Sequence, residues 1–256
     1  MPRFAANLTM LFNELPFIDR FAAAAEAGFA AVEYLFPYEW PAEQLAEALA
    51  RHGLAQVLHN LPPGDWGAGE RGIACHPGRV GEFQEGVGRA IEYARTLGCP
   101  QLNCLAGIAP DGEDPQRLWQ TFADNLAFAA RELDKAGLRL LIEPINTFDI
   151  PGFLLNRTEQ AVQMLERVGA GNLAIQYDIY HAQRMEGELA ATIARHLPRI
   201  GHMQLADNPG RHEPGSGEIN FGFLFGEIDR LGYDGWIGCE YRPATTTLAG
   251  LGWLPQ

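Results

Sequence analysis

The chain has 256 residues, 47% of them hydrophobic, and its 19 basic and 32 acidic residues give a formal net charge of −13 at pH 7. This charge repels nucleic-acid phosphates and anionic lipid surfaces, so it argues against both as partners. Lys135 is the only lysine, so any Schiff-base or phosphate-loop amine chemistry would have to use this one residue.

Strand and helix patterns alternate along the chain. Short apolar runs of the kind found in strands buried on both faces predict strands at 3–8, 31–36, 55–61, 100–106, 139–145, 173–179, 200–206 and 236–241. Amphipathic segments predict helices at 16–27, 41–52, 81–97, 114–136, 157–168, 187–197 and 221–231. Many helical segments end at a glycine, such as Gly53 or Gly98, which accepts the left-handed conformation of a helix terminus.

Eight successive strand and helix patterns predict an α/β protein with a single (β/α)8 TIM barrel, spanning residues 1–256 as one domain. An open, doubly wound sheet is the alternative. That fold usually has a glycine-rich turn after its first strand, and residues 7–16 contain no glycine.

The cysteines and the apolar runs bear on the cellular setting. The four cysteines show neither a CxxC pair nor metal-type spacing, which is typical of a reduced, cytoplasmic protein. We expect no signal peptide, because the first residues lack a long apolar stretch before a small-residue cleavage site. No apolar run reaches the roughly 18 residues that span a bilayer, so we expect no membrane partner.

Two long loops and a group of polar residues lie where a barrel builds its active site. The loops, residues 61–81 and 207–220, follow the third and seventh predicted strands. Oxygen-bearing side chains interrupt the apolar pattern toward the ends of four consecutive strands, as Glu143, Asp178, Gln204 and Glu240. Any one of them alone could be a structural hydrogen-bond acceptor.

Together these four side chains indicate a metal site. Three carboxylates that meet in a barrel mouth need a compensating charge, because an unpaired buried charge is strongly destabilising. A divalent cation supplies that charge, and an all-oxygen ligand set favours Mg²⁺ or Mn²⁺ over Zn²⁺.

Three further residues are candidates for substrate contacts. His181 follows the sixth strand in a predicted loop, where it either polarises a substrate oxygen or is simply solvated. Arg211 lies in the loop after the seventh strand, where a guanidinium is either a surface group or a two-pronged clamp for a carboxylate. His59, near the end of the third strand, is a weaker candidate.

Several long segments resemble one enzyme family. The resemblance is carried by RFAANLTMLF, EYLFPYEWP, LHNLPPGDWGAGERGIACHPGR, LLIEPINTFDIPGF, IQYDIYHAQRMEGEL, ADNPGRHEPGSGEIN and GWIGCEYRP. These segments are similar to those of the hydroxypyruvate isomerases, which belong to the sugar-isomerase-like TIM barrels together with xylose isomerase and the ketose 3-epimerases. The resemblance covers nearly the whole chain.

The resemblance implies an activity and a site. It implies reversible conversion of hydroxypyruvate, a small anionic keto acid, to tartronate semialdehyde, with Glu143 and Glu240 as the proton-transferring pair. It also implies that these two glutamates, Asp178 and Gln204 hold one divalent cation, Mg²⁺ or Mn²⁺, which need not be essential for turnover. The epimerases usually have histidine where this chain has Gln204.

The substrate contacts follow from the same resemblance. His181 and Arg211 match substrate-contacting positions of the epimerases. We expect an arginine, either Arg211 or Arg71 in the GERG segment, to hold the substrate carboxylate. A homo-oligomer is compatible with the sequence, which does not determine the oligomeric state.

Other functions are alternatives to this one. Within enzymes, the alternatives are an isomerase of a 2-oxo-tetronate and a ketose 3-epimerase. An abasic-site endonuclease on the same barrel needs a histidine-rich three-zinc cluster and a basic DNA face, whereas the seven histidines show no ligand spacing and the charge is −13. A non-catalytic binding protein would have no reason to place three carboxylates at strand ends.

Overall fold

A computed structural model describes residues 2–254 and contains a closed barrel of eight parallel strands. The strands follow one another around the barrel in chain order, and the first pairs with the last. They are β1 (Arg3–Asn7), β2 (Ala31–Glu33), β3 (Ala55–Asn60), β4 (Gln101–Cys104), β5 (Arg139–Ile142), β6 (Leu173–Asp178), β7 (Ile200–Leu205) and β8 (Trp236–Cys239). The predicted (β/α)8 fold is therefore confirmed.

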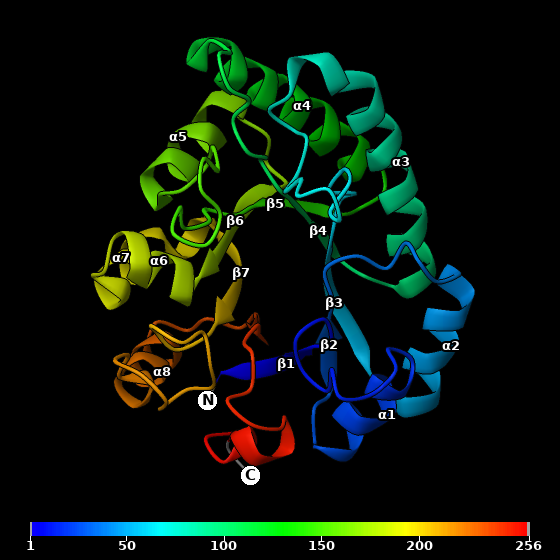
Figure 1. Cartoon of the computed structure of the whole chain (residues 1–256), viewed down its shortest axis with the longest axis vertical. Coiled ribbons are helices and arrows are strands. Elements are labelled where there is room, and N and C mark those ends of the chain that lie inside the picture. The colour runs from blue at the N-terminus through cyan, green and yellow to red at the C-terminus, as the bar shows by residue number, and fades with distance from the viewer. Residues whose placement is uncertain (1, 255–256) are drawn as a thin grey trace.

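Helices surround the barrel, and Figure 1 shows them following one another around the ring of strands. They are α1 (Asp19–Glu26), α2 (Ala42–His52), α3 (Val80–Leu97), α4 (Pro115–Lys135), α5 (Thr158–Val168), α6 (Ile179–Met185), α7 (Leu189–His196) and α8 (Phe221–Arg230). Short 3₁₀ turns occur at Pro77–Arg79, Leu197–Arg199 and Leu248–Leu251. Within residues 2–254, no helix is both long enough and apolar enough to cross a bilayer.

Helix α4 illustrates how the sequence builds the outer layer. The Asp114 side chain accepts a hydrogen bond from the backbone N–H of Gln116 and so caps the first turn, where Pro115 has no N–H and needs no acceptor. The predicted apolar stripe at four-residue steps is buried against the strands, and it includes Leu118, Phe122 and Leu126. Each such side chain contributes about 1.5–3 kcal/mol through its burial.

Helix α6 was not predicted, because the segment after the sixth strand was expected to be a loop. Asp178 ends β6 and its Oδ1 accepts hydrogen bonds from the backbone N–H groups of Tyr180 at 2.7 Å and His181 at 3.3 Å. This side chain therefore caps the helix that starts at the next residue. As a result, His181 lies on a helix and is held rigidly against the barrel mouth, and the prediction that it lies in a loop was wrong.

The long loop after β7 is organised around Asp207, which is buried. Its carboxylate accepts hydrogen bonds of 2.9–3.0 Å from four backbone N–H groups, those of Asn208, Gly215, Gly217 and Ile219. The backbone of Arg211 lies inside this folded loop and adopts a left-handed φ of 56°. The loop thus carries the Arg211 side chain to the mouth of the barrel.

Candidate active site

A cavity of about 570 Å³ opens at the carboxyl ends of the strands. Its lining includes five of the residues expected from the sequence: Arg71, Glu143, His181, Arg211 and Glu240. Asp178 lies beside it, next to His181, in a small adjoining hollow. The fold therefore brings residues from five separate strand ends and loops to one place, as parallel barrels do.

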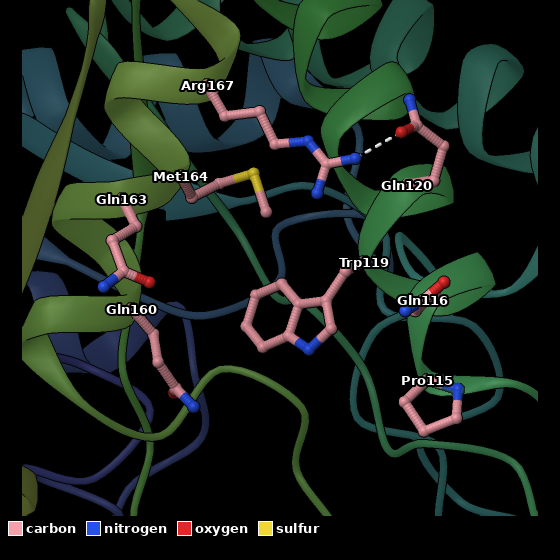
Figure 2. Close-up of a pocket in the computed structure, with 8 residues that line it drawn as sticks. All are labelled: Pro115, Gln116, Trp119, Gln120, Gln160, Gln163, Met164 and Arg167. Atoms are coloured by element: carbon pink, nitrogen blue, oxygen red, sulfur yellow. Dashed lines mark hydrogen bonds between the residues drawn. The ribbon is translucent and has the colours of Figure 1, made fainter.

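A second hollow, of about 600 Å³, lies on the outer surface between α4 and α5. Figure 2 shows the Trp119 side chain projecting into this space and Arg167 donating a hydrogen bond to Gln120 across it. The lining consists mainly of amide and apolar side chains and holds no carboxylate or histidine among the described residues. It offers no group for acid–base chemistry, so the barrel mouth is the candidate active site.

Glu143 and Glu240 are the two carboxyl groups that line the cavity most deeply. They directly follow β5 and β8, one residue beyond the last paired residue, and are only 4% and 5% exposed. Burial raises the pKa of Glu240 to about 8 despite the nearby Arg211. Burial, together with the charges of Glu240 and Asp178, also raises the pKa of Glu143 well above its ordinary value. Both groups therefore retain protons far more readily than they would in water.

Arg211 supplies positive charge among these acids. Its Nη2 atom lies 2.6 Å from Oε1 of Glu240 and 3.9 Å from Oδ2 of Asp178. Its guanidinium also stacks over the ring of Tyr180, at 5.1 Å from the ring centroid. The sequence suggested that either Arg211 or Arg71 binds the substrate carboxylate. In the structure, Arg211 is the counter-charge of the protein's own carboxylates.

A second group of side chains has the composition of a cation site. Glu143, Asp178 and His181 each offer one ligand atom, and these atoms lie within 4.8 Å of one another. Oδ2 of Asp178 is buried and accepts no hydrogen bond from the described residues. The other oxygen of the same carboxylate, Oδ1, caps α6. A buried carboxylate oxygen without a donor fits a site for a divalent cation.

Gln204 is not arranged as the expected ligand. Its amide nitrogen donates to Glu240 Oε2 at 2.5 Å and to Glu33 Oε1 at 2.7 Å, and its oxygen accepts a hydrogen bond from Gln176 at 2.6 Å. The oxygen that would bind a cation is therefore occupied within the barrel interior. In this arrangement Gln204 orients the Glu240 carboxyl group.

Glu33 is a buried acid that the sequence analysis did not single out. It ends β2, is 1% exposed, and receives hydrogen bonds from Asn7 at 2.9 Å and Gln204 at 2.7 Å, while His202 Nε2 lies 2.7 Å from its other oxygen. A Cβ atom at Gly238 would clash with the Glu33 carboxylate, so any larger residue there would displace this carboxylate from its hydrogen bonds. The signal was present, since this glutamate interrupts an apolar run just as Glu143 does.

The two remaining candidates, His59 and Arg71, lie in different surroundings. His59 is fully buried beside Gln56 and the ring of Tyr38 and does not line the cavity, so the structure does not bring it to the site. Arg71 does line the cavity. Its Nη1 donates to the backbone carbonyls of Trp66 and Glu70, and its guanidinium stacks 4.0 Å from the centroid of the Trp66 ring.

Arg71 differs from Arg211 in its charge balance. Among the described residues, no carboxylate lies within ion-pair distance of the Arg71 guanidinium, whereas Arg211 has three acidic neighbours within 4.0 Å, namely Glu240, Asp178 and Asp149. Held by main-chain oxygens and an aromatic face, Arg71 is a preorganised cation with hydrogen-bond donors to spare. It is the better placed of the two arginines for an anionic ligand.

Known proteins resemble this chain over nearly its whole length. A family model described as "Xylose isomerase-like TIM barrel" matches residues 21–256. The chain is 55% identical over 254 residues to a hydroxypyruvate isomerase of Escherichia coli K12, covering 99% of this chain and 98% of the relative. It is 53% identical over 254 residues to a 2-oxo-tetronate isomerase of Cupriavidus necator, with the same shares covered. A crystal structure titled AP endonuclease, family 2, from Brucella melitensis superposes with a TM-score of 0.97 at 47% identity, covering 99% of this chain and 98% of that one.

Proposed function

The chain belongs to the xylose isomerase-like TIM barrel family and is an isomerase of the aldose–ketose type, and from this premise we propose that it interconverts hydroxypyruvate and tartronate semialdehyde. The observation that carries the proposal is the pair of buried carboxyl groups, Glu143 and Glu240, that line one cavity and hold protons tightly. A carboxyl group whose pKa is raised toward neutrality can accept or donate a proton near physiological pH.

The reaction moves a carbonyl by one carbon. Hydroxypyruvate carries a ketone at C2 and a hydroxymethyl group at C3. One glutamate removes a proton from C3, which gives an enediolate spanning C2 and C3, and the other glutamate delivers a proton to C2. The hydroxyl proton at C3 is lost as the C3 carbonyl forms, and the C2 oxygen gains one, so protons and electrons balance. Glu143 and Glu240 exchange roles when the reaction runs backward.

The negative charge that develops on the substrate oxygens must be stabilised by groups already in place. His181 and Arg211 line the same cavity as the glutamates and offer N–H donors for this purpose. Glu143 and Asp178 would hold a divalent cation, Mg²⁺ or Mn²⁺, whose charge would add to this stabilisation. Asn103 and Gln204 keep the two reacting carboxyl groups in position through hydrogen bonds of 3.0 Å and 2.5 Å.

The substrate carboxylate needs a partner of its own, and we assign this role to Arg71. A guanidinium recognises a carboxylate through two parallel hydrogen bonds, and among the described residues this one is not used by a carboxylate of the protein. Its interaction would also favour an anionic keto acid over a neutral sugar. The four free, buried cysteines fit a reducing compartment, and we place the enzyme in the cytoplasm.

A 2-oxo-tetronate is the second candidate substrate. The cavity of about 570 Å³ is roomier than a three-carbon acid requires, and a relative at 53% identity is named for the four-carbon compound. The endonuclease function is less well supported. The one group of potential metal ligands found among residues 2–254 has three members and a single histidine, and the net charge of −13 opposes DNA binding.

A direct assay tests the proposal. The purified chain is given hydroxypyruvate, a 2-oxo-tetronate and a ketose in parallel, before and after chelation, and kcat/KM is compared. The highest kcat/KM for hydroxypyruvate supports the proposal. The highest kcat/KM for another compound would identify that compound as the substrate instead. Turnover in D₂O should place deuterium in the product, whereas complete retention of the substrate hydrogen would indicate a hydride shift and refute proton transfer between glutamates.

A further inference from the structure

Asn146 is a buried residue in the loop after β5, and its amide group has a fixed orientation. Its side-chain oxygen accepts hydrogen bonds from the backbone N–H groups of Phe148 at 3.0 Å and Asp149 at 2.8 Å. Its side-chain nitrogen donates to Oδ2 of Asp149 at 3.1 Å. Rotating the amide by half a turn would lose all three hydrogen bonds, so the position of the nitrogen is determined by the loop.

That nitrogen lies 2.6 Å from Nδ1 of His181. An amide nitrogen offers only hydrogens, so Nδ1 must be the acceptor and cannot itself carry a proton. The backbone N–H of Asn146 also points toward the same ring nitrogen, at 3.5 Å. In the neutral ring the proton then lies on Nε2, which is the atom nearer the carboxylates, at 3.8 Å from Glu143 and 3.7 Å from Asp178.

The surroundings also keep the ring neutral. His181 is 3% exposed, and a second proton on Nδ1 would oppose the N–H groups of Asn146 that face this atom, so the ring carries only the Nε2 proton. A neutral ring with its proton on Nε2 cannot bind a cation through that atom, since the lone pair is taken. It can donate a hydrogen bond to an oxygen that enters the gap between Nε2 and the carboxylates.

We propose that Asn146 is a positioning residue that holds His181 in the Nε2–H tautomer, so that His181 donates a hydrogen bond to a substrate oxygen instead of binding a cation. The catalytic consequence rests on the function proposed above, in which charge develops on the substrate oxygens. The tautomer itself rests only on the contacts of Asn146. Glu143 and Asp178 are then the residues of this group that remain for a cation.

Nitrogen NMR of the histidine rings tests the tautomer directly. In protein labelled with ¹⁵N-histidine and free of metal, the His181 signals are identified by their loss in His181→Gln. We expect a pyridine-type shift at Nδ1 and a pyrrole-type shift at Nε2. A protonated Nδ1 in the unmodified protein would overturn the proposal, whatever the activity.

The variant Asn146→Asp tests the positioning role. A carboxylate still accepts the two backbone N–H groups of the loop, but it presents an acceptor to Nδ1 and so draws the ring proton there. We expect the Nδ1 signal to become pyrrole-type and kcat to fall about 100-fold, the usual effect of losing one oxyanion donor, with a smaller change in KM. If the proton moves and kcat does not change, the positioning role is refuted.

Asn172→Asp is the matched control. Asn172 precedes β6 and lies outside the cavity, and its side-chain nitrogen donates to the backbone carbonyls of Ala130 and Leu138 instead of to a histidine. We expect this variant to keep both the His181 tautomer and kcat within a few-fold of the unmodified protein. The NMR result needs no substrate, so it separates failure of this inference from failure of the proposed reaction.

Discussion

Nη2 of Arg211 lies 2.6 Å from Oε1 of Glu240, so the most deeply placed cation of the cavity is paired with one of the two reacting carboxyl groups. Arg211 is 15% exposed at its side chain and has Asp178 as a second acidic neighbour. Removing one partner of a buried ion pair leaves the other charge uncompensated, which is costly. We therefore propose that Arg211 acts with the two glutamates in proton transfer and that another arginine binds the substrate carboxylate.

Replacing Arg211 should therefore impair both stability and turnover. We expect Arg211→Gln to lower the free energy of unfolding by about 3 kcal/mol, the usual effect of breaking a buried pair, and to lower kcat more than it raises KM. Urea denaturation and steady-state kinetics measure the two effects. Arg95→Gln is the control, because Arg95 is exposed on α3 and does not line the cavity. A change confined to KM in Arg211→Gln would contradict the assigned role.

Each of the two glutamates should be indispensable. Glu143→Gln and Glu240→Gln preserve size and most hydrogen bonds but cannot exchange a proton with carbon, so kcat should fall by at least about 100-fold in each. Circular dichroism should show an intact fold. Glu85→Gln on the exposed face of α3 controls for the substitution and should leave kcat unchanged. A variant of either site residue with near-normal turnover would exclude that residue from the pair.

Arg71 should act on binding. Arg71→Gln removes a guanidinium that stacks on Trp66 and has no carboxylate of the protein as a partner among the described residues. We expect KM for hydroxypyruvate to rise about 10–100-fold, as for loss of a charge-assisted hydrogen bond of about 1.5–3 kcal/mol, with little change in kcat. Arg117→Gln on α4 serves as a surface control. An unchanged KM would indicate that Arg211, and not Arg71, binds the substrate carboxylate.

The raised pKa values predict how stability depends on pH. The pKa of Glu240 is about 8 in the folded chain and 4.5 when unfolded, so between these values the folded state binds the extra proton. The free energy of unfolding should therefore decrease as the pH rises through this window. The pKa values of Glu143 and Asp178 shift in the same direction.

Denaturation of the metal-free protein at both ends of that window measures this slope. Glu240→Gln cannot ionise, so its stability should change less with pH than that of the unmodified chain. Equal slopes in the two proteins would show that Glu240 does not titrate in this range. Added Mg²⁺ or Mn²⁺ should stabilise the protein most at the alkaline end, because a cation favours the ionised carboxylates.

The sequence was sufficient to predict the barrel because its strands are buried on both faces and its helices end at recognisable residues. It also singled out Glu143 and Glu240, which line the cavity, since a charged residue within an apolar run is costly to bury and so indicates a candidate site. The start of α6 was missed because Asp178 was interpreted only as a cation ligand, whereas it also caps that helix. A sequence pattern that assigns a single role to a residue does not reveal that the same side chain also caps a helix.

The orientation of side chains was harder to predict than their positions. Adjacent residues of a strand point to opposite faces, so Asn60 lines the cavity while His59 faces the outer layer. If the predicted end of the strand is shifted by one residue, the side chain expected to face the cavity faces the helices instead. For Gln204, the deciding contact comes from Glu33 on β2, far away in the sequence. Hydrogen-bond partners that are far apart in the sequence can be identified only in the folded barrel.

The hydrogen bonds that link Glu33, Gln204 and Glu240 also have a consequence for protein engineering. These hydrogen bonds connect the barrel interior to Glu240, a proposed reacting group. Filling the centre of the barrel with larger apolar side chains, one route to a more heat-resistant protein, would therefore disturb this group directly. The layer between strands and helices has no such connection at residues such as Leu118 and Phe122. Directed evolution for thermostability should therefore accumulate its successful substitutions in that outer layer.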